Sequence, residues 1–210
     1  MKNKDNLLER DILENARQAF IENGFNGTSM SDIAARTGIN RTVLHYYFHT
    51  KEIMFNAVLG DILSSFLPRV RDIVTDRDKS VSERIDSVIS TYLDALAENP
   101  GIPLFIIREI HRDFHLLESA LKDLGLDRHI SFIRLALKRE MDEGNINRVP
   151  VKIIFLTFYS LVTAPFLTEG LVRAIFMKEN EDYDMLLKEW KPYVASHMKE
   201  LLCPDNAHAN

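Results

Sequence analysis

Cysteine, proline and glycine are all scarce in this chain. Its 210 residues include one cysteine, Cys203, seven prolines and eight glycines. A single cysteine cannot form a disulfide within the chain, so we expect a reducing compartment, the cytoplasm. Few prolines and glycines provide little material for the turns of a β fold and favour long helices. An apolar fraction of 46% and a charged fraction of 27% are those of an ordinary globular protein.

Long apolar runs are missing as well. The longest uncharged run, residues 153–168, has 16 residues, fewer than the roughly 20 that a membrane-spanning helix needs. The first 20 residues are strongly charged, which is not typical of a signal peptide. We therefore expect no membrane partner and a cytoplasmic location.

An excess of positive charge is absent too, since the net charge is −5. Residues 1–51 carry seven Lys/Arg and six Asp/Glu, and the remainder carries 19 and 25. This asymmetry has the sign expected of a nucleic-acid-binding head, but it is small. Charge alone does not indicate a DNA-binding protein.

The usual enzyme motifs are not found. The chain has no Gly-rich phosphate loop, no G-x-S-x-G and no paired Glu-x-x-His. His111 and His115 are four apart, but the zincin motif requires glutamate directly after the first histidine, where Arg112 stands. We expect no enzyme activity, no cofactor and no metal; a helical metal-dependent enzyme remains a third option.

Residues 29–51 are the most informative segment and predict two short helices joined by a tight turn. Ser29, with Asp32 three residues later, forms a helix-start pattern. Gly38 lies where the turn needs a residue that tolerates positive φ. Asn40 is a good N-cap for the second helix. The spacing predicts a helix-turn-helix, whose second helix enters the major groove of DNA.

The second helix has one face for packing and one suited to DNA. Leu44 and Phe48, four residues apart, form a buried stripe. The remaining side chains then point elsewhere, Arg41 and Tyr46 among them. Because a guanidinium can bond guanine O6 and N7 together, Arg41 is the best candidate for base readout.

This segment resembles the amino-terminal signature of the TetR (tetracycline repressor) family in the pattern Ile33-Ala34-x-x-x-Gly38-Ile39-Asn40-x-x-x-Leu44-x-x-Tyr47-Phe48-x-x-Lys51-Glu52. The preceding helix is similar as well, with Ile12, Ala16, Ala19 and Phe20 followed by Asn23-Gly24-Phe25. The resemblance covers about residues 8 to 55. The chain departs from it at His45, where the family usually has tyrosine, and at Thr37, where alanine is common.

The resemblance implies an all-α fold with two domains. Residues 1–51 are expected to form a three-helix DNA-binding head, and residues 52–210 a helical effector-binding and dimerisation domain. Some head residues are expected to contact bases and others phosphates. The expected DNA-binding residues are Ser29, Ser31, Arg41, Thr42, Val43, Tyr46, Tyr47 and Lys51.

The remainder of the chain has helical periodicity throughout. A helix capped by Thr50 is expected to run through Leu63, which would carry one helix across the domain boundary. The later helices are expected over about residues 81–98, 103–114, 118–141 with a break near Gly125, 150–177 with a kink near Pro165, and a last one ending near Leu201.

Two further sites are expected in this helical domain. The family uses the region for a small-molecule pocket, and aromatic walls would suit an apolar or amphipathic ligand; the alternative is plain core packing. The expected pocket residues are Phe105, His111, Phe114, Phe132, Phe155, Phe158 and Tyr159. The last two helices are expected to form a four-helix dimer bundle through Leu161, Phe166, Leu187, Trp190, Val194, Met198 and Leu201; the alternative is a fully internal core helix.

The predicted function is sequence-specific transcriptional regulation. We expect a homodimeric repressor that binds double-stranded DNA at a palindromic operator and is released by an unidentified small-molecule effector. The alternative is a helical ligand-binding or scaffold protein without specific DNA binding.

Overall fold

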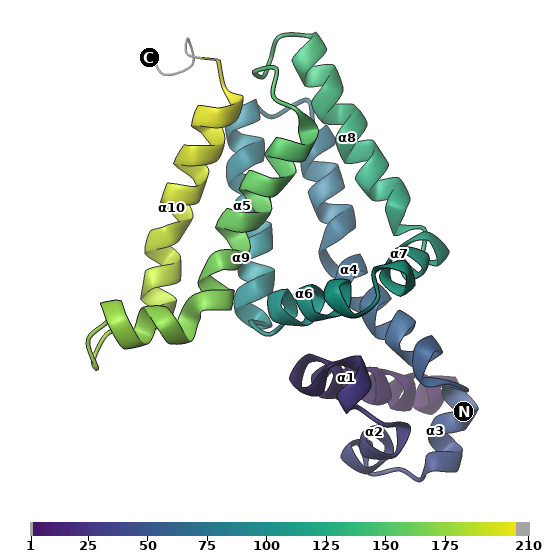
Figure 1. The fold of residues 1–210 in the computed structure, drawn as a ribbon. Coiled ribbons are helices and arrows are strands. Elements are labelled where there is room, and N and C mark those ends of the chain that lie inside the picture. Colours follow the sequence, from purple (N-terminus) through teal and green to yellow (C-terminus); the bar gives the residue numbers. More distant parts are fainter. Residues whose placement is uncertain (1, 205–210) are drawn as a thin grey trace. The chain divides into compact units, whose positions relative to one another are not determined.

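The computed structural model describes residues 2–204, and the side chains of these apart from residues 2–5 and 116. Within that range the chain is helical and contains no strand, as predicted (Figure 1). The helices are α1 (Lys2–Gly27), α2 (Met30–Thr37), α3 (Arg41–Tyr47), α4 (Lys51–Thr75), α5 (Val81–Glu98), α6 (Ile102–Arg112), α7 (Phe114–Asp123), α8 (Leu126–Asp142), α9 (Val151–Phe176) and α10 (Tyr183–Leu202).

The chain divides into two compact units. The first comprises Met1–Ser65 and Leu104–Leu126, and the second Phe66–Pro103 and Asp127–Asn210. The predicted boundary after residue 51 falls one residue inside α4 (Lys51–Thr75). The first unit nevertheless continues along α4 to Ser65 and takes in α7 and most of α6. Helices distant in the sequence therefore share a compact unit with the helix-turn-helix.

A cluster of phenylalanines forms the centre of the first unit. The Phe55 ring of α4 lies 5.5 Å from Phe20 and 5.2 Å from Phe25, both edge-on, and 5.8 Å from Phe105 of α6. All four side chains are buried. Phe105 was predicted to line a ligand pocket, but it packs in this core. The sequence could not separate the two roles, because a phenylalanine at helical spacing is compatible with either.

The second unit is built around α5, α9 and α10, which pack against one another. Its core includes Ile89 of α5, Val162 of α9, and Val194 and Met198 of α10. The prediction that Val194 and Met198 lie in a dimer interface is not consistent with this burial, because the chain's own core already covers both.

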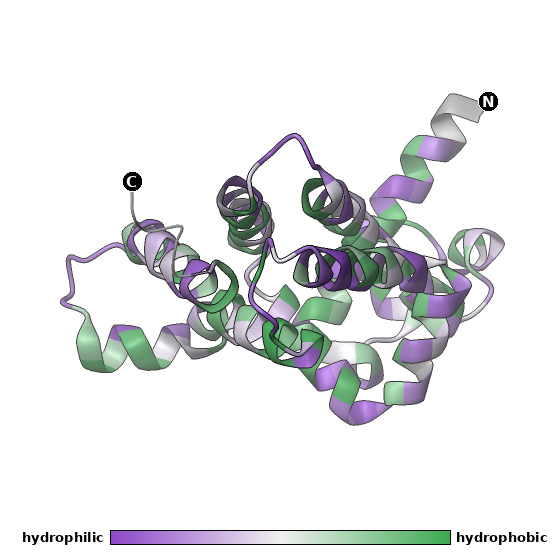
Figure 2. Cartoon of the chain, turned by 90° about the horizontal axis from the view of Figure 1, so that it is seen from above, coloured by the Kyte–Doolittle hydropathy of each residue, from purple (hydrophilic) through white to green (hydrophobic). Residues whose placement is uncertain are grey.

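Helix α9 presents more apolar surface than its own unit covers. It is 26 residues long, and only 22% of its most apolar stretch is buried. By length and hydropathy alone, α9 and α4 could each cross a membrane. The uncharged run of residues 153–168 had been judged too short for a membrane-spanning helix. In the carboxyl-terminal half of α9, Leu171 and Ile175 are exposed, and Figure 2 shows hydrophobic residues along this part, at the left of the view.

A buried ion pair joins α5 to α8 in the second unit. Arg84 Nη1 donates to Glu140 Oε1 at 2.9 Å and to the carbonyl oxygen of Val74 at 2.9 Å. The two charged side chains are 11% and 9% exposed. Hydrogen bonds from Arg84, and then from Asn145, lower the pKa of Glu140. The stabilisation from this carboxylate is therefore complete above its ordinary pKa and is lost as the pH falls through the lowered value.

Replacing Arg84 with alanine should lower the free energy of unfolding by about 3 kcal/mol, because the Glu140 carboxylate would remain buried without its partner. Urea unfolding at pH 7, followed by circular dichroism, measures this loss. Arg77→Ala is the matched control, since Arg77 pairs with Glu143 at the surface and should cost less than about 1 kcal/mol. Equal losses in the two variants would contradict the assignment.

Candidate nucleic-acid interface

Local capping fixes the first helix of the motif and the turn after it. The Ser29 hydroxyl oxygen accepts the Asp32 N–H at 3.1 Å, and the Asp32 carboxylate accepts the Ser29 N–H at 2.9 Å. The Ser29 hydroxyl also donates to Asp32 Oδ2 at 2.6 Å, and this bond, followed by the one from the Ser29 N–H, lowers the pKa of Asp32. Gly38 ends the helix at φ 74°, and the Ile39 N–H then reaches the Ala34 carbonyl at 3.0 Å. The predicted cap and turn are confirmed.

The second helix, α3, begins at its predicted cap and exposes the side that was predicted to face DNA. The Asn40 side-chain oxygen accepts the Val43 N–H at 2.8 Å. Leu44 is fully buried, whereas Arg41 is exposed and Tyr46 is 78% exposed. Because the buried stripe anchors one face, the opposite face remains available to a DNA groove.

The other predicted DNA-binding residues have mixed environments. Ser29, Ser31 and Thr42 are exposed, while Val43 and Tyr47 are half-buried. The Tyr47 ring lies edge-on to Tyr46 at 5.3 Å. These placements leave their DNA contacts as predictions.

Lys51 has a structural role that the sequence did not reveal. Its Nζ donates to the carbonyl oxygens of Phe25 at 3.0 Å and Thr28 at 3.1 Å. Two of its three N–H bonds are therefore used inside the head, beside the point where α1 turns at Gly24 with φ 71°. A helix end leaves carbonyls without helical partners, and Lys51 supplies some of the missing donors.

Side chains of helix α6 also bind the backbone at this turn. Arg108 donates to the carbonyl oxygens of Ile21 and Glu22. The buried Glu109 carboxylate, 2% exposed, accepts the Phe25 N–H at 3.0 Å. These residues lie 84 to 87 positions apart in the sequence, so no local pattern could have indicated the contact.

Two cations and a carboxylate lie close to Phe25. Arg112 Nε donates to Glu109 Oε2 at 2.5 Å. The Phe25 ring lies 4.2 Å from Lys51 Nζ and 4.2 Å from the Arg112 guanidinium carbon. A cation near the face of an aromatic ring is attracted to it. Phe25, Lys51, Glu109 and Arg112 thus form one group, called the α1–α6 junction below, which also includes Arg108.

The structure brings only part of the predicted ligand pocket together. Phe114, Phe132 and Phe155 are largely exposed. His111 is exposed, with Nδ1 2.9 Å from the Ile107 carbonyl oxygen. In the described residues no group of three or more His, Cys, Asp or Glu side chains is placed to hold a metal ion.

A smaller aromatic group does form in the second unit. Tyr92, which the sequence reading missed, lies 4.9 Å from Phe66 and 4.9 Å from Phe158, both edge-on. The Tyr159 ring stacks on Phe155 at 5.6 Å. Burial raises the pKa of both tyrosines, so their phenols are neutral hydrogen-bond donors at physiological pH.

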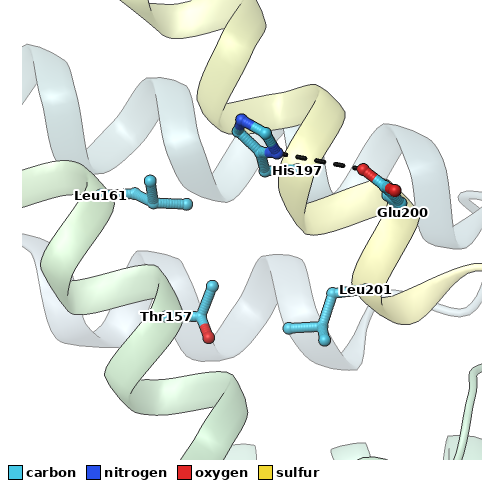
Figure 3. Close-up of a pocket in the computed structure, with 5 residues that line it drawn as sticks. All are labelled: Thr157, Leu161, His197, Glu200 and Leu201. Atoms are coloured by element: carbon cyan, nitrogen blue, oxygen red, sulfur yellow. Dashed lines mark ion pairs between the residues drawn. The ribbon is translucent and has the colours of Figure 1, made fainter.

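Two of the predicted interface residues line a groove between α9 and α10. This hollow of about 540 Å³ is bordered by Thr157, Leu161, His197, Glu200 and Leu201 (Figure 3). His197 Nδ1 lies 3.9 Å from a Glu200 carboxylate oxygen. Phe166, Leu187 and Trp190 are half-buried, and the Trp190 indole donates to the Leu161 carbonyl at 2.9 Å.

Comparison with known proteins identifies the head. Residues 12–58 match the family model of the bacterial regulatory proteins, tetR family. This part of the chain therefore has the DNA-binding segment of the TetR family. A curated relative named a probable HTH-type transcriptional regulator, YttP of Bacillus subtilis (strain 168), is 21% identical over 189 residues, covering 88% of this chain and 91% of YttP. The HTH-type transcriptional regulator RutR of Escherichia coli (strain K12) is 41% identical over 59 residues, 28% of each chain.

Solved structures of transcriptional regulators share the fold along most of the chain. FadR from Bacillus subtilis, in complex with stearoyl-CoA, superposes with a TM-score of 0.66 at 18% identity and covers 89% of this chain and 97% of its own. The fatty acid degradation regulator FadR from Bacillus halodurans gives 0.67 at 16% identity, with coverage of 90% and 94%. These structures show the fold, whereas the match of residues 12–58 and the curated relatives support a DNA-binding transcriptional regulator, a class of protein that is not enzymatic.

Replacing Glu109 with alanine should reduce the free energy of unfolding by about 2–3 kcal/mol, since the Phe25 N–H would be left buried and unbonded and Arg112 would lose its partner. Urea unfolding measures the change. Glu118→Ala, which removes an exposed carboxylate paired with Lys122 on α7, should remain close to the unmodified protein. A Glu109 variant as stable as the Glu118 variant would show that the junction contributes nothing.

Proposed function

We propose that this regulator is a homodimeric repressor that binds a palindromic operator and is released by an amphipathic small molecule. The observation that carries the proposal is the exposed Arg41 face of α3, held by the Asn40 cap and the buried Leu44. A cation on an anchored recognition helix can read guanine in the major groove.

Two copies are needed for a palindrome, because each recognition helix reads one half-site and the half-sites lie about 34 Å apart. The exposed apolar residues of α9 and the groove between α9 and α10 offer a surface for the second copy. An apolar face this extended on one helix is typical of a surface that another protein chain covers. We place the dimer contact there, with Leu171 and Ile175 in it.

The aromatic group around Tyr92 supports an amphipathic effector. Phe66, Phe158 and Phe155 offer apolar contacts, while Tyr92 and Tyr159 offer two neutral donors. Such a site suits an apolar chain that ends in a hydrogen-bond acceptor. The acyl thioester of the stearoyl-CoA bound by B. subtilis FadR has this chemistry, so long-chain acyl thioesters are the first class to test.

Release requires that effector binding change the head. Helices α4 and α6 each continue from the second unit into the first, and both contribute side chains to the α1–α6 junction. A small displacement of either helix would therefore act on the end of α1. Allosteric coupling of about 1–3 kcal/mol corresponds to roughly 5- to 150-fold weaker DNA binding, which is enough for a switch.

Selection of the purified protein against a randomised duplex library should enrich a palindrome. Arg41→Ala should reduce discrimination against a substituted guanine position by about 1–3 kcal/mol, because the base contact is lost while phosphate contacts remain. Repeating the selection at two salt concentrations separates base from phosphate binding.

Arg36→Ala is the matched control, because Arg36 is an exposed arginine of α2 that pairs with Glu22. It should leave the enriched sequence unchanged. Salt-sensitive binding without enrichment would favour the alternative function, a helical ligand-binding or scaffold protein without specific DNA binding.

Leu171→Glu should convert the dimer into monomers, because a charge would be buried between the two copies. Sedimentation velocity at micromolar concentration measures the change. Leu135→Glu on α8 is the control, since Leu135 and Leu171 have the same exposure, 57%, and only Leu171 lies in the proposed interface. A monomeric unmodified protein, or a Leu171 variant that stays dimeric, would contradict this interface.

A further inference from the structure

We propose that His45 positions Arg41 for base readout and makes the sequence preference of this regulator fall at acidic pH. The inference rests on the proposed function, in that Arg41 is taken to read a base. The inference goes beyond the proposed function because it assigns a second residue, His45, to sequence specificity. At this position the chain departs from the tyrosine that is usual in the family.

The hydrogen bonds of His45 are consistent with a single protonation state. Arg41 Nε, which is always a donor, lies 3.2 Å from His45 Nε2. His45 Nδ1 lies 3.1 Å from the carbonyl oxygen of His49, which can only accept. Nε2 must therefore be unprotonated and Nδ1 must carry the hydrogen, so the imidazole is neutral. Both contacts require the same tautomer.

This arrangement leaves the reading end of Arg41 available. The guanidinium has five N–H bonds, of which His45 occupies the one on Nε. The terminal nitrogens remain for O6 and N7 of a guanine. Because His45 already restricts the Arg41 side chain, less conformational entropy is lost on binding. Immobilising one flexible side chain changes affinity by about 2- to 10-fold, which is the contribution assigned to His45.

Protonation of His45 would reverse this effect. A charged imidazole carries hydrogen on both nitrogens and cannot accept from Arg41. It would also repel the guanidinium and add a positive charge beside the DNA phosphates. Acidification should thus weaken discrimination between sequences while strengthening binding to any duplex. A tyrosine at this position would not change charge between pH 5 and 8.

Two titratable or charged side chains contact His45. Arg41 Nε lies 3.2 Å from its Nε2, and His49 Nδ1 lies 2.8 Å from its carbonyl oxygen. Charged groups on the adjoining helices have partners elsewhere or are exposed. Asp32 bonds Ser29, Arg36 bonds Glu22, Lys51 bonds the carbonyls of Phe25 and Thr28, and Glu52 is exposed. Among the residues that the structure describes, His49 is therefore the neighbouring imidazole whose effect the experiment must separate from that of His45.

The test compares two duplexes, the selected palindrome and a version with the guanine position of each half-site replaced. Affinities of the full-length protein for both are measured between pH 8 and pH 5.5 at constant ionic strength. For the unmodified protein the ratio of the two affinities should fall about 2- to 10-fold with acidification, while affinity for the replaced duplex rises.

Three variants separate the effect of the His45 imidazole from that of His49. His45→Gln keeps an acceptor that does not titrate, so its affinity ratio should stay constant across the pH range. His45→Leu lacks the acceptor and should have the reduced ratio at every pH. His49→Gln removes the neighbouring imidazole but keeps the backbone carbonyl, and should follow the unmodified protein.

Several outcomes would overturn the inference alone, with a palindrome still enriched. These are a His45→Leu protein that discriminates like the unmodified one at pH 8, a His45→Gln protein whose ratio falls with acidification, and a His49→Gln protein whose ratio does not. If the unmodified protein enriches no sequence at any pH, the proposed function fails and the inference fails with it.

Discussion

The end of helix α1 is the constraint on which the head depends. The chain turns at Gly24, and the peptide groups around the turn cannot complete a helical hydrogen-bond ladder. Leaving such groups buried and unbonded costs about 1–3 kcal/mol each. Lys51 and Arg108 supply donors to the carbonyls, and Glu109 supplies an acceptor to the Phe25 N–H. The head is thus completed by side chains from α4 and α6.

This dependence gives a physical basis for regulation. The helix-turn-helix has its own caps, which fix the relation of α2 to α3, and α2 packs directly on α1. The α1–α6 junction then joins the end of α1 to side chains of α4 and α6. Because α4 and α6 extend beyond that unit, a ligand that shifted either helix, as in the proposed mechanism, would alter the partners of the α1 end. The energy available for switching is limited by what the junction contributes, which is within the range of typical allosteric coupling.

The parts that the sequence predicted well are those set by short-range rules. The Ser29–Asp32 cap, the Gly38 turn, the Asn40 cap and the break at Gly125 each depend on neighbours within a few residues. The contacts of α6 with the end of α1 were not foreseeable, because they pair residues more than 80 positions apart. Val194 and Met198 were misplaced because an apolar stripe does not reveal whether the chain's own core or a second copy covers it. Helix α9 extends beyond the uncharged run of residues 153–168. It includes Glu169 and Arg173, whose charges pair with each other at 2.7 Å on the helix surface.

Hydrogen exchange at the Phe25 amide, followed by NMR, tests the role of the junction most directly. The account predicts that this amide exchanges slowly in the intact protein, because it donates to a buried carboxylate, and that it becomes fast in the Glu109→Ala variant while the amides of α3 keep their rates. An amide that exchanges rapidly in the intact protein, or a rate that Glu109→Ala leaves unchanged, would contradict the claim that α6 holds the DNA-binding head.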